Sequence, residues 1–441
     1  MNFRKLILPA VLGGAFIATA IDPALAEDAK TTETQFILNT MNFLFCGALV
    51  MFMAAGFAML ESGLVRSKNT ATICLKNIAL YSVAGLMYYV VGYNLMYSGV
   101  DGGFMGSFAI WGPDDAAAAG GDYSGNYATA SDWFFQMVFV ATAASVVSGA
   151  LAERIKLWPF LLFVVFLTGI IYPIQGSWQW GGGWLSAMGF ADFAGSTLVH
   201  SVGGWAALTG AIILGARKGK YDAEGRVHPM PGANLPLATV GTFILWLGWF
   251  GFNGGSQLAM GTAGDLIAIS QIFINTNIAA AAGVVAAMAA TQLMYKKVDL
   301  SMALNGAIAG LVSITAGPDT PTLGMAVLIG AVGGILVVFA VPLLDKFKID
   351  DVVGAISAHL VAGIWGTMAV PLTNSDASFV TQATGVVSIG AFVIVTSTIF
   401  WLILKFTVGI RVSEEDEEMG LDMAELGMEA YPEFGRGSQK L

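Results

Sequence analysis

Two of the chain's three histidines stand at the same distance behind an aspartate. His200 ends the stretch DFAGSTLVH, which begins at Asp192, and His359 ends DVVGAISAH, which begins at Asp351. Both stretches read Asp-x-x-Gly-x-x-x-x-His, although most of the residues between them differ. A neutral imidazole can hydrogen-bond a bare amine or pass on a proton. The pair therefore predicts a path for a small basic molecule or for protons.

The chain around these histidines has the composition of a membrane protein. Of its 441 residues 56% are hydrophobic and only 11% are charged, whereas a soluble domain carries about 25% charged residues. Its 55 glycines suit helices that approach closely in lipid. A soluble protein with a large apolar core is excluded, because its surface would lack charge. The net charge of −10 lies largely in the C-terminal tail and does not indicate nucleic-acid binding.

The N-terminus predicts a cleaved secretory signal peptide over residues 1–26. Arg4 and Lys5 precede an apolar run, and Ala24-Leu25-Ala26 is a cleavage signal of the small-x-small kind. The alternative is an uncleaved first membrane helix, but the run is short for a span. Residues 27–410 then form the membrane domain, and residues 411–441 form a C-terminal tail.

Eleven further apolar stretches are long enough to cross a bilayer as helices. None alternates as barrel strands do, so the predicted fold class is an all-α integral membrane protein. The expected spans lie near residues 36–63, 71–99, 132–152, 157–176, 193–216, 235–256, 265–294, 301–317, 322–344, 352–372 and 384–409.

The loops between these spans alternate between a basic set and an acidic set. By the positive-inside rule the basic set is cytoplasmic. The mature N-terminus is then outside and the C-terminus cytoplasmic, in a multi-pass protein of the cell inner membrane. The basic loops carry Arg66, Lys68, Arg154, Lys156, Arg217, Lys218, Lys220, Arg226, Lys296, Lys297, Lys346, Lys348 and Arg411, and the acidic loops carry Asp101, Asp114, Asp115, Asp122, Asp265, Asp319 and Asp376.

This topology makes the two histidine segments an inverted pair. Asp192 opens the fifth span from outside, and Asp351 opens the tenth span from inside. Eight residues at 1.5 Å each carry a histidine about 12 Å into a hydrocarbon core about 30 Å thick. Spans one to five and six to ten therefore predict an inverted 5+5 repeat with a site near the midplane, followed by one extra helix.

Each polar residue of the pair has alternative roles. The histidines could be packing residues or the two axial ligands of a haem, but ionisable residues at membrane depth usually line a pathway. Either aspartate could simply cap a helix N-terminus. Asp192 is the stronger candidate for attracting a cation, because its end of the helix faces outside. Asp351 is expected to be structural.

Aromatic residues gather where this topology places the outer face. They lie in WFFQMVF (133–139), WGGGW (180–184) and WFGFNGGS (249–256). One alternative is an aromatic belt at the lipid interface. However, aromatic faces attract cations, and the hydroxyl of Ser256 can accept a hydrogen bond from a donor-only ion. Such a cup suits an ammonium-type cation, and deeper phenylalanines would bar hydrated metal ions.

Taken together, these motifs resemble the Amt/Mep/Rh ammonium transporters, on the bacterial Amt branch. The resemblance rests on long, ordered motifs and covers all eleven spans and the start of the tail, so residues 27–410 would be the ammonium transporter domain. The motifs are GFAMLESGLVRSKN (56–69), GALAERI (149–155), WGGG with DFAGSTLVH (180–200), GWFGFNGGS (248–256), NGAIAGLV (305–312), DDVVGAISAH (350–359) and TVGIRV with GLD (407–422).

The resemblance implies that ammonium or methylammonium is recruited outside, loses a proton and passes inward as ammonia, with or without the proton. The substrate-binding residues that it implies are Phe135, Phe139, Trp180, Ser256 and Asp192; the gate would be Phe139 and Phe252, and the pore lining His200, His359 and Trp249.

The resemblance also implies a homotrimer and contact with PII signalling proteins at the cytoplasmic face. The acidic SEEDEE (413–418) departs from the family pattern and puts PII binding in question. No cofactor, metal site or enzymatic activity is expected. Two other functions stay open: an ammonium sensor with little flux, and an Rh-like channel for neutral gas. The long outer loop 101–131 receives no role.

Overall fold

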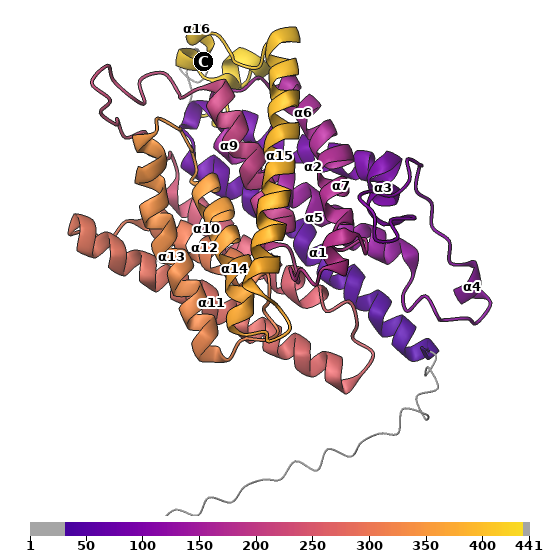
Figure 1. Cartoon of the computed structure of the whole chain (residues 1–441). Coiled ribbons are helices and arrows are strands. Elements are labelled where there is room, and N and C mark those ends of the chain that lie inside the picture. Colours follow the sequence, from indigo (N-terminus) through magenta and orange to yellow (C-terminus); the bar gives the residue numbers. More distant parts are fainter. Residues whose placement is uncertain (1–30, 435–441) are drawn as a thin grey trace, which may run out of the picture.

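The computed structural model describes residues 31–434, so the predicted signal peptide lies outside the described range. Within that range the chain is helical, with two isolated bridges and no strand (Figure 1). The elements are α1 (Glu33–Leu64), η2 (Ser67–Asn69), α2 (Thr70–Met87), η3 (Tyr88–Gly92), α3 (Tyr93–Tyr97), α4 (Ala116–Ala119), α5 (Thr129–Ala150), α6 (Leu157–Phe166), η4 (Leu167–Ile171), α7 (Tyr172–Ser177), α8 (Trp184–Ala187), η5 (Ser196–Ser201), α9 (Val202–Leu214), α10 (Leu235–Gly255), α11 (Ala263–Tyr295), α12 (Leu300–Ile314), α13 (Leu323–Lys346), η6 (Ile356–Val361), α14 (Ala362–Ala369), η7 (Val370–Leu372), α15 (Phe379–Thr407), α16 (Glu414–Met419) and η8 (Asp422–Leu426).

Nine helices in residues 31–434 are long and apolar enough to cross a membrane. Two shorter apolar helices, Leu300–Ile314 and Ile356–Leu372, coincide with the eighth and tenth expected spans. Helices on the periphery expose large apolar side chains; Ile267 is 71% and Val285 66% exposed. A lipid-facing surface explains this exposure, because lipid tails are as apolar as these side chains. The predicted all-α membrane fold is confirmed.

Helices α1 and α10 pack closely along their length, because glycines on α10 leave no side chains between them. A Cβ added at Gly241 would collide with the backbone of Leu60, and one at Gly248 would collide with the side chain of Met53. Gly241 and Gly248 are seven residues apart and therefore share one face of the helix. Small residues of this kind hold membrane helices together where water gives no driving force.

Both histidine segments are helices that begin with a wide, π-helical turn. The segment η5 leads into α9, and η6 leads into α14. Just before them, Gly195 has a φ of 106° and Gly354 a φ of 78°. A side chain is strained at these angles, which explains why the Asp-x-x-Gly pattern recurs. Single π-turns often mark functional sites.

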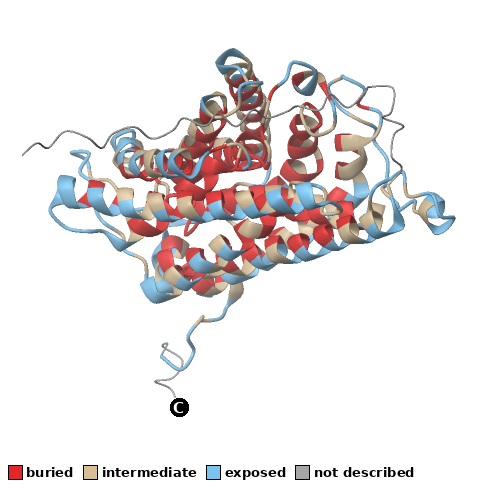
Figure 2. Ribbon diagram, turned by 90° about the horizontal axis from the view of Figure 1, so that it is seen from below, coloured by how far each residue is buried: buried red, intermediate tan, exposed pale blue. Residues whose placement is uncertain are grey.

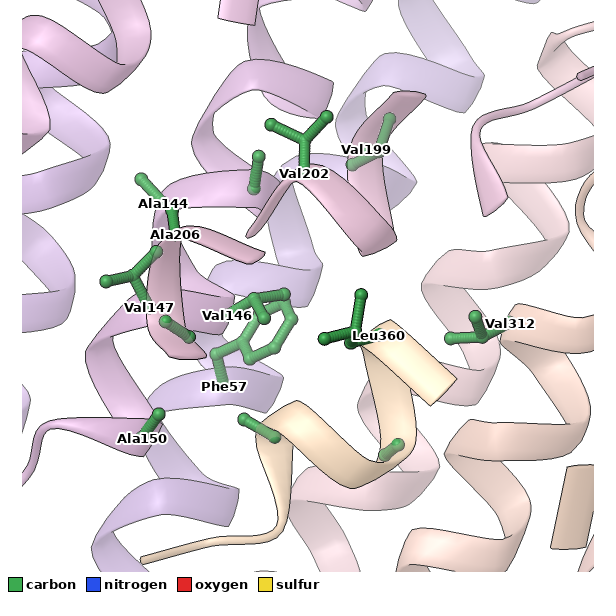
Figure 3. Packing of buried hydrophobic residues seen from close by; sticks show 14 of the residues in the cluster. Phe57, Ala144, Val146, Val147, Ala150, Val199, Val202, Ala206, Val312 and Leu360 are labelled. Atoms are coloured by element: carbon green, nitrogen blue, oxygen red, sulfur yellow. The ribbon is translucent and has the colours of Figure 1, made fainter. Parts of the chain in front are cut away.

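The buried core lies where these broken helices meet the central helix α5. Figure 2 shows buried residues gathered along the middle of the bundle, with exposed residues on its outer faces. In the apolar 18-residue stretch that marks α5 as a possible membrane span, 83% of the residues are buried. Figure 3 shows buried residues from α1, α5, η5, η6 and α12 within one cluster. Phe57 and Leu360 belong to this cluster, which surrounds the histidine segments.

The C-terminal tail gathers several predicted cytoplasmic loops at one end of the bundle, where α16 lies in Figure 1. Lys68 Nζ donates to the carbonyl of Glu417 at 2.8 Å. Lys218 Nζ pairs with Glu414 at 2.8 Å. The carboxylate of Asp422 accepts the free N–H groups at the start of α2 at 2.8 and 2.9 Å. Two of the basic loops therefore meet at the tail.

Candidate functional site

A cavity of about 290 Å³ lies between the start of α5, the end of α10 and the loop after α7. Four predicted residues line it: Phe135 and Phe139 from α5, Trp180 from the loop, and Ser256 from the end of α10. The structure thus brings together residues that are up to 121 positions apart in the sequence. A fifth lining residue, Asp132, was not among the predicted ones.

The aromatic rings of this cavity form a cup. Phe135 and Phe139 are one helical turn apart, with ring centroids 4.8 Å apart. Trp180 meets Phe139 edge-on at 6.1 Å, and its Nε1 donates to the carbonyl of Asp192 at 3.0 Å. Ser256 Oγ donates to the Phe252 carbonyl at 2.8 Å, so its lone pairs can accept a hydrogen bond from a ligand.

Below the cup, Phe139 and Phe252 stack across the path. Their centroids are 3.9 Å apart with an angle of 26° between the rings, and they are 2% and 0% exposed. They come from α5 and α10, so the stack joins two helices. No oxygen of these side chains could replace the water around a metal ion, which makes passage of a hydrated ion costly.

The two histidines lie directly beyond this stack. His200 has its ring 5.3 Å from Phe252 and 4.8 Å from Trp249. The Nδ1 atoms of His200 and His359 are 3.2 Å apart. One Nδ1 must carry a proton for the other to accept, so the rings share one hydrogen bond. This contact leaves no room for a haem between them, which removes the haem alternative for the pair.

The second ring nitrogen of His200, Nε2, is available to bind a ligand. His200 Nε2 is buried and has no hydrogen-bond partner within the part of the chain that the structure describes. A buried polar atom without a partner is costly, so this nitrogen is available to a small hydrogen-bonding molecule.

Trp249, also predicted, is held in place by its Nε1, which donates to Thr315 Oγ1 at 2.8 Å. Phe57 from α1 faces His359 at 6.2 Å.

Asp192 lies beside this path and is not among the residues that line the cavity. Its Oδ1 accepts the N–H groups of Gly195 at 3.1 Å and Ser196 at 2.8 Å. Its Oδ2 accepts those of Thr197 and Leu198, both at 2.8 Å. The carboxylate thus satisfies four free N–H groups at the start of the broken helix. It holds the start of the helix in place from a position outside the cavity lining.

On the other side of the histidines, Asp351 lines an inner cavity of about 430 Å³. Its Oδ2 accepts the Ser357 N–H at 3.1 Å. Arg217, Lys220 and Asn305 line the same cavity. This cavity therefore has a lining of charged, polar and apolar side chains.

Sequence reasoning missed Asp132 and Phe57. The signal for Asp132 was present, because an acid at the end of a membrane span usually marks a functional site. Phe57 had no such signal. It is one of 28 phenylalanines, and only the packing of α1 against the broken helices places it beside His359.

Comparisons with known proteins identify the family of this chain. The model of the Ammonium Transporter Family matches residues 41–431. The chain is 41% identical to the ammonium transporter Amt2 of Archaeoglobus fulgidus over 95% of this chain and 93% of that one. It is 33% identical to an ammonium transporter of Bacillus subtilis over 89% of this chain and 98% of that one.

Solved structures show the same relationship. One described as a Sensor Amt Protein has a TM-score of 0.83 and 36% identity, covering 89% of this chain and 99% of that chain. The structure of Candida albicans Mep2 has a TM-score of 0.78 and 28% identity, covering 90% and 91%. This multi-pass membrane protein belongs to the ammonium transporter family.

Proposed function

We propose that the protein carries ammonium across the membrane by separating it into ammonia and a proton. One observation carries the proposal: an aromatic cup, a stacked phenylalanine pair and two touching histidines follow one another along one path. The cup suits a cation, and the histidine pair suits a neutral amine. A change of charge state between them accounts for both.

The cup supplies the first step. Phe135, Phe139 and Trp180 offer ring faces or edges to a cation whose water they exclude, which strengthens cation–π attraction. Ser256 accepts one N–H of the ion. An ammonium ion can exchange its water for these contacts, whereas a potassium ion would need several oxygen ligands, and the Phe139–Phe252 stack beyond the cup supplies none.

The proton leaves the ion near the Phe139–Phe252 stack. An N–H bond of ammonium breaks, the electron pair stays on nitrogen, and the proton passes to His200 Nε2 or to water beside it. Asp192 stabilises positive charge in this part of the path, on ammonium and on the departing proton alike, while its own oxygens stay on the backbone. The neutral ammonia then hydrogen-bonds the imidazoles of His200 and His359 and moves on to the inner cavity. The proton follows along the hydrogen bond between the two histidines, so that one positive charge crosses with each ammonia.

The same proposal includes the finer topology. Eleven spans form an inverted 5+5 repeat, in which the segment of η5 and α9 corresponds to that of η6 and α14, and α15 is the extra helix. The cup faces outside and the tail lies in the cytoplasm of a cell with an inner membrane. The subunit assembles as a homotrimer, and the tail is a candidate contact for a PII protein.

Electrical recording from proteoliposomes tests the proposal. We expect ammonium pulses to give currents that saturate with concentration, and vesicles without protein to give none. Uptake of methylammonium or ammonia without current would point to a neutral channel. Binding without current or uptake would point to a sensor.

The sensor is the second candidate function, because one similar structure is described as a Sensor Amt Protein and the tail is docked on predicted cytoplasmic loops. A truncation after residue 412 distinguishes the two functions. A transporter keeps a saturable current without its tail, whereas a sensor shows no current with or without it.

A further inference from the structure

The outer cavity contains a carboxylate that the steps above do not use. Asp132 lies in the first turn of α5, lines the cavity and is 6% exposed. It precedes Phe135 by three residues, Gln136 by four and Phe139 by seven, so all four lie on one face of α5. With a rise of 1.5 Å per residue, Asp132 stands about 10 Å above the gate residue Phe139.

The surroundings of Asp132 leave its negative charge unpaired. Tyr93 Oη donates to Oδ2 at 2.5 Å, and Gln136 Nε2 reaches Oδ1 at 3.4 Å. None of the ion pairs in residues 31–434 includes Asp132. A buried charge without a counter-charge is costly. A cation in the cavity would supply the missing charge.

A purely structural role does not account for this acid. Aspartate in a first helical turn often caps free N–H groups. Here the hydrogen bonds of Asp132 come from the side chains of Tyr93 and Gln136, unlike those of Asp192, which come from four backbone N–H groups. The carboxylate is thus held by hydroxyl and amide donors that orient it without neutralising it.

Tyrosines complete the surroundings. Tyr97 lines the cavity, and its Oη is buried without a hydrogen-bond partner in the described part of the chain. Tyr127 also lines the cavity and meets Phe43 edge-on at 4.5 Å. It belongs to the long outer loop, which is tied to α1 on both sides of it: Asn39 Nδ2 donates to Asn126, and Ala128 N donates to Thr40. These two hydrogen bonds hold Tyr127 at the cavity.

We propose that Asp132, with the hydroxyl of Tyr97, forms a first cation subsite above the aromatic cup and raises the affinity for ammonium. This inference rests on the proposed function and deepens it. The ion first meets a carboxylate and a hydroxyl, which are good acceptors for a donor-only cation. It then moves one turn down α5 to Phe135, where cation–π attraction replaces the carboxylate.

Concentration series of ammonium pulses on proteoliposomes test this subsite. Asp132→Asn keeps the shape and removes the charge, so its half-saturation concentration should rise about tenfold, equivalent to about 1.4 kcal/mol, with the maximal current within about twofold of wild type. Asp132→Glu restores the charge and should return the half-saturation to within about threefold of wild type. Asp376→Asn, an exposed acid of a predicted outer loop, is the matched control and should behave as wild type.

Each outcome is decisive. An unchanged half-saturation in Asp132→Asn, or an Asp132→Glu variant as weak as Asp132→Asn, overturns the subsite while the saturating wild-type current upholds the proposed function. If the wild type gives no saturating response, the proposed function fails and the subsite with it. If Asp132→Asn does not elute as folded protein, Tyr97→Phe takes its place: a rise of about threefold supports the subsite, and no change overturns it.

Discussion

The two broken helices that carry the histidines are anchored differently at their N-termini. At the outer one, the carboxylate of Asp192 alone receives four backbone N–H groups at 2.8 to 3.1 Å. At the inner one, Asp351 receives the N–H of Ser357 at 3.1 Å and its hydroxyl at 3.4 Å. The same Asp-x-x-Gly pattern therefore produces a strong cap at one end and a weaker cap at the other.

The inner end has a second anchor one residue earlier. Asp350 accepts Nε of Arg217 at 2.8 Å, Nη2 at 2.9 Å and the backbone N–H at 2.9 Å. Arg154 Nη2 donates to the Asp350 carbonyl at 2.8 Å. The side chains of Arg217 and Asp350 are 3% and 0% exposed. A buried, bidentate ion pair thus holds the inner helix start.

Holding the helix start and placing a carboxylate beside the proposed path are two tasks. At the inner end two aspartates divide them, whereas at the outer end Asp192 performs both. Asp192 holds the helix and, in the proposed mechanism, also supplies negative charge beside the cation path. On the inside, Asp350 and Arg217 hold the chain, while Asp351 lines the inner cavity. Substitutions at the outer end should therefore affect fold and transport together, and those at the inner end should affect them separately.

The largest effect on stability is expected for Arg217→Met. It leaves the buried Asp350 without its main partner, which costs about 3–5 kcal/mol. Thermal unfolding in detergent measures this loss. Lys218→Met is the matched control, because Lys218 is 44% exposed and a surface pair contributes about 1 kcal/mol or less. Equal losses in the two variants would show that the inner anchor is not Asp350 with Arg217.

Asp192→Asn should lower the stability somewhat less than Arg217→Met does, but it should abolish most of the transport. The asparagine amide keeps one acceptor oxygen, but its NH2 group replaces the second oxygen and faces backbone N–H groups that then have no acceptor. This should lower the free energy of unfolding by about 2–4 kcal/mol. With the charge also gone, we expect the ammonium current to fall about 100-fold. Asp265→Asn, which alters the exposed cap of α11, should keep its current. A current within threefold of wild type in Asp192→Asn would contradict this role.

The stability gap between Arg217→Met and wild type should shrink in acid. Burial alone would raise the pKa of Asp350, but the hydrogen bond and charge of Arg217, with the charge of Arg154, hold it well below its usual range. A carboxylate with a lowered pKa contributes stability above its unfolded pKa of about 3.9 and loses it only as pH falls through the folded pKa. The wild-type pair is therefore unaffected between pH 7.5 and 5.5.

In the Arg217→Met variant the guanidinium of Arg217 no longer opposes the effect of burial on Asp350. The pKa of Asp350 therefore rises, and acid protonates its carboxylate. Protonation relieves the cost of the buried charge, and the gap in unfolding free energy should narrow by about 1–2 kcal/mol over those two pH units. Unfolding curves at both pH values measure it. A gap that stays constant would show that the cost of the variant does not come from the charge.

Asp351→Asn should have the smallest effect. Its carboxylate accepts from the N–H and hydroxyl of Ser357 at 3.1 and 3.4 Å, and the Asp350 anchor stays in place. We expect about 1 kcal/mol or less and a current within about threefold of wild type. Recordings from Asp192→Asn and Asp351→Asn prepared together measure the contrast. Equal losses of current would remove the distinction between the two ends.

The helical class could be predicted from the sequence because the chemistry of a membrane span is local, and candidate site residues could be named from their motifs. A long apolar stretch must form a helix in lipid, and the repeated Asp-x-x-Gly-x-x-x-x-His needs only one spacing to be seen. In the structure, Phe135, Phe139, Trp180 and Ser256 line one cavity, and their part in binding a cation stays a prediction.

Other features depend on packing between distant segments. The contact between Nδ1 of His200 and Nδ1 of His359 joins residues 159 positions apart, and no spacing rule gives its geometry. The inner anchor was hidden because Arg217 reads as one more basic loop residue until Asp350 is placed against it. The role of Asp192 was seen in part: its position was predicted, but its four backbone hydrogen bonds depend on the left-handed turn at Gly195.

The separation of ammonia from its proton is the central claim, and one comparison of two cations tests it. Currents are recorded for ammonium and potassium pulses on wild type and on the double variant His200→Ala with His359→Ala. We predict that wild type responds to ammonium alone, and that the double variant also carries potassium, because alanines leave room for water and for a hydrated ion. A double variant that still carries ammonium current and rejects potassium as the wild type does would contradict the claim.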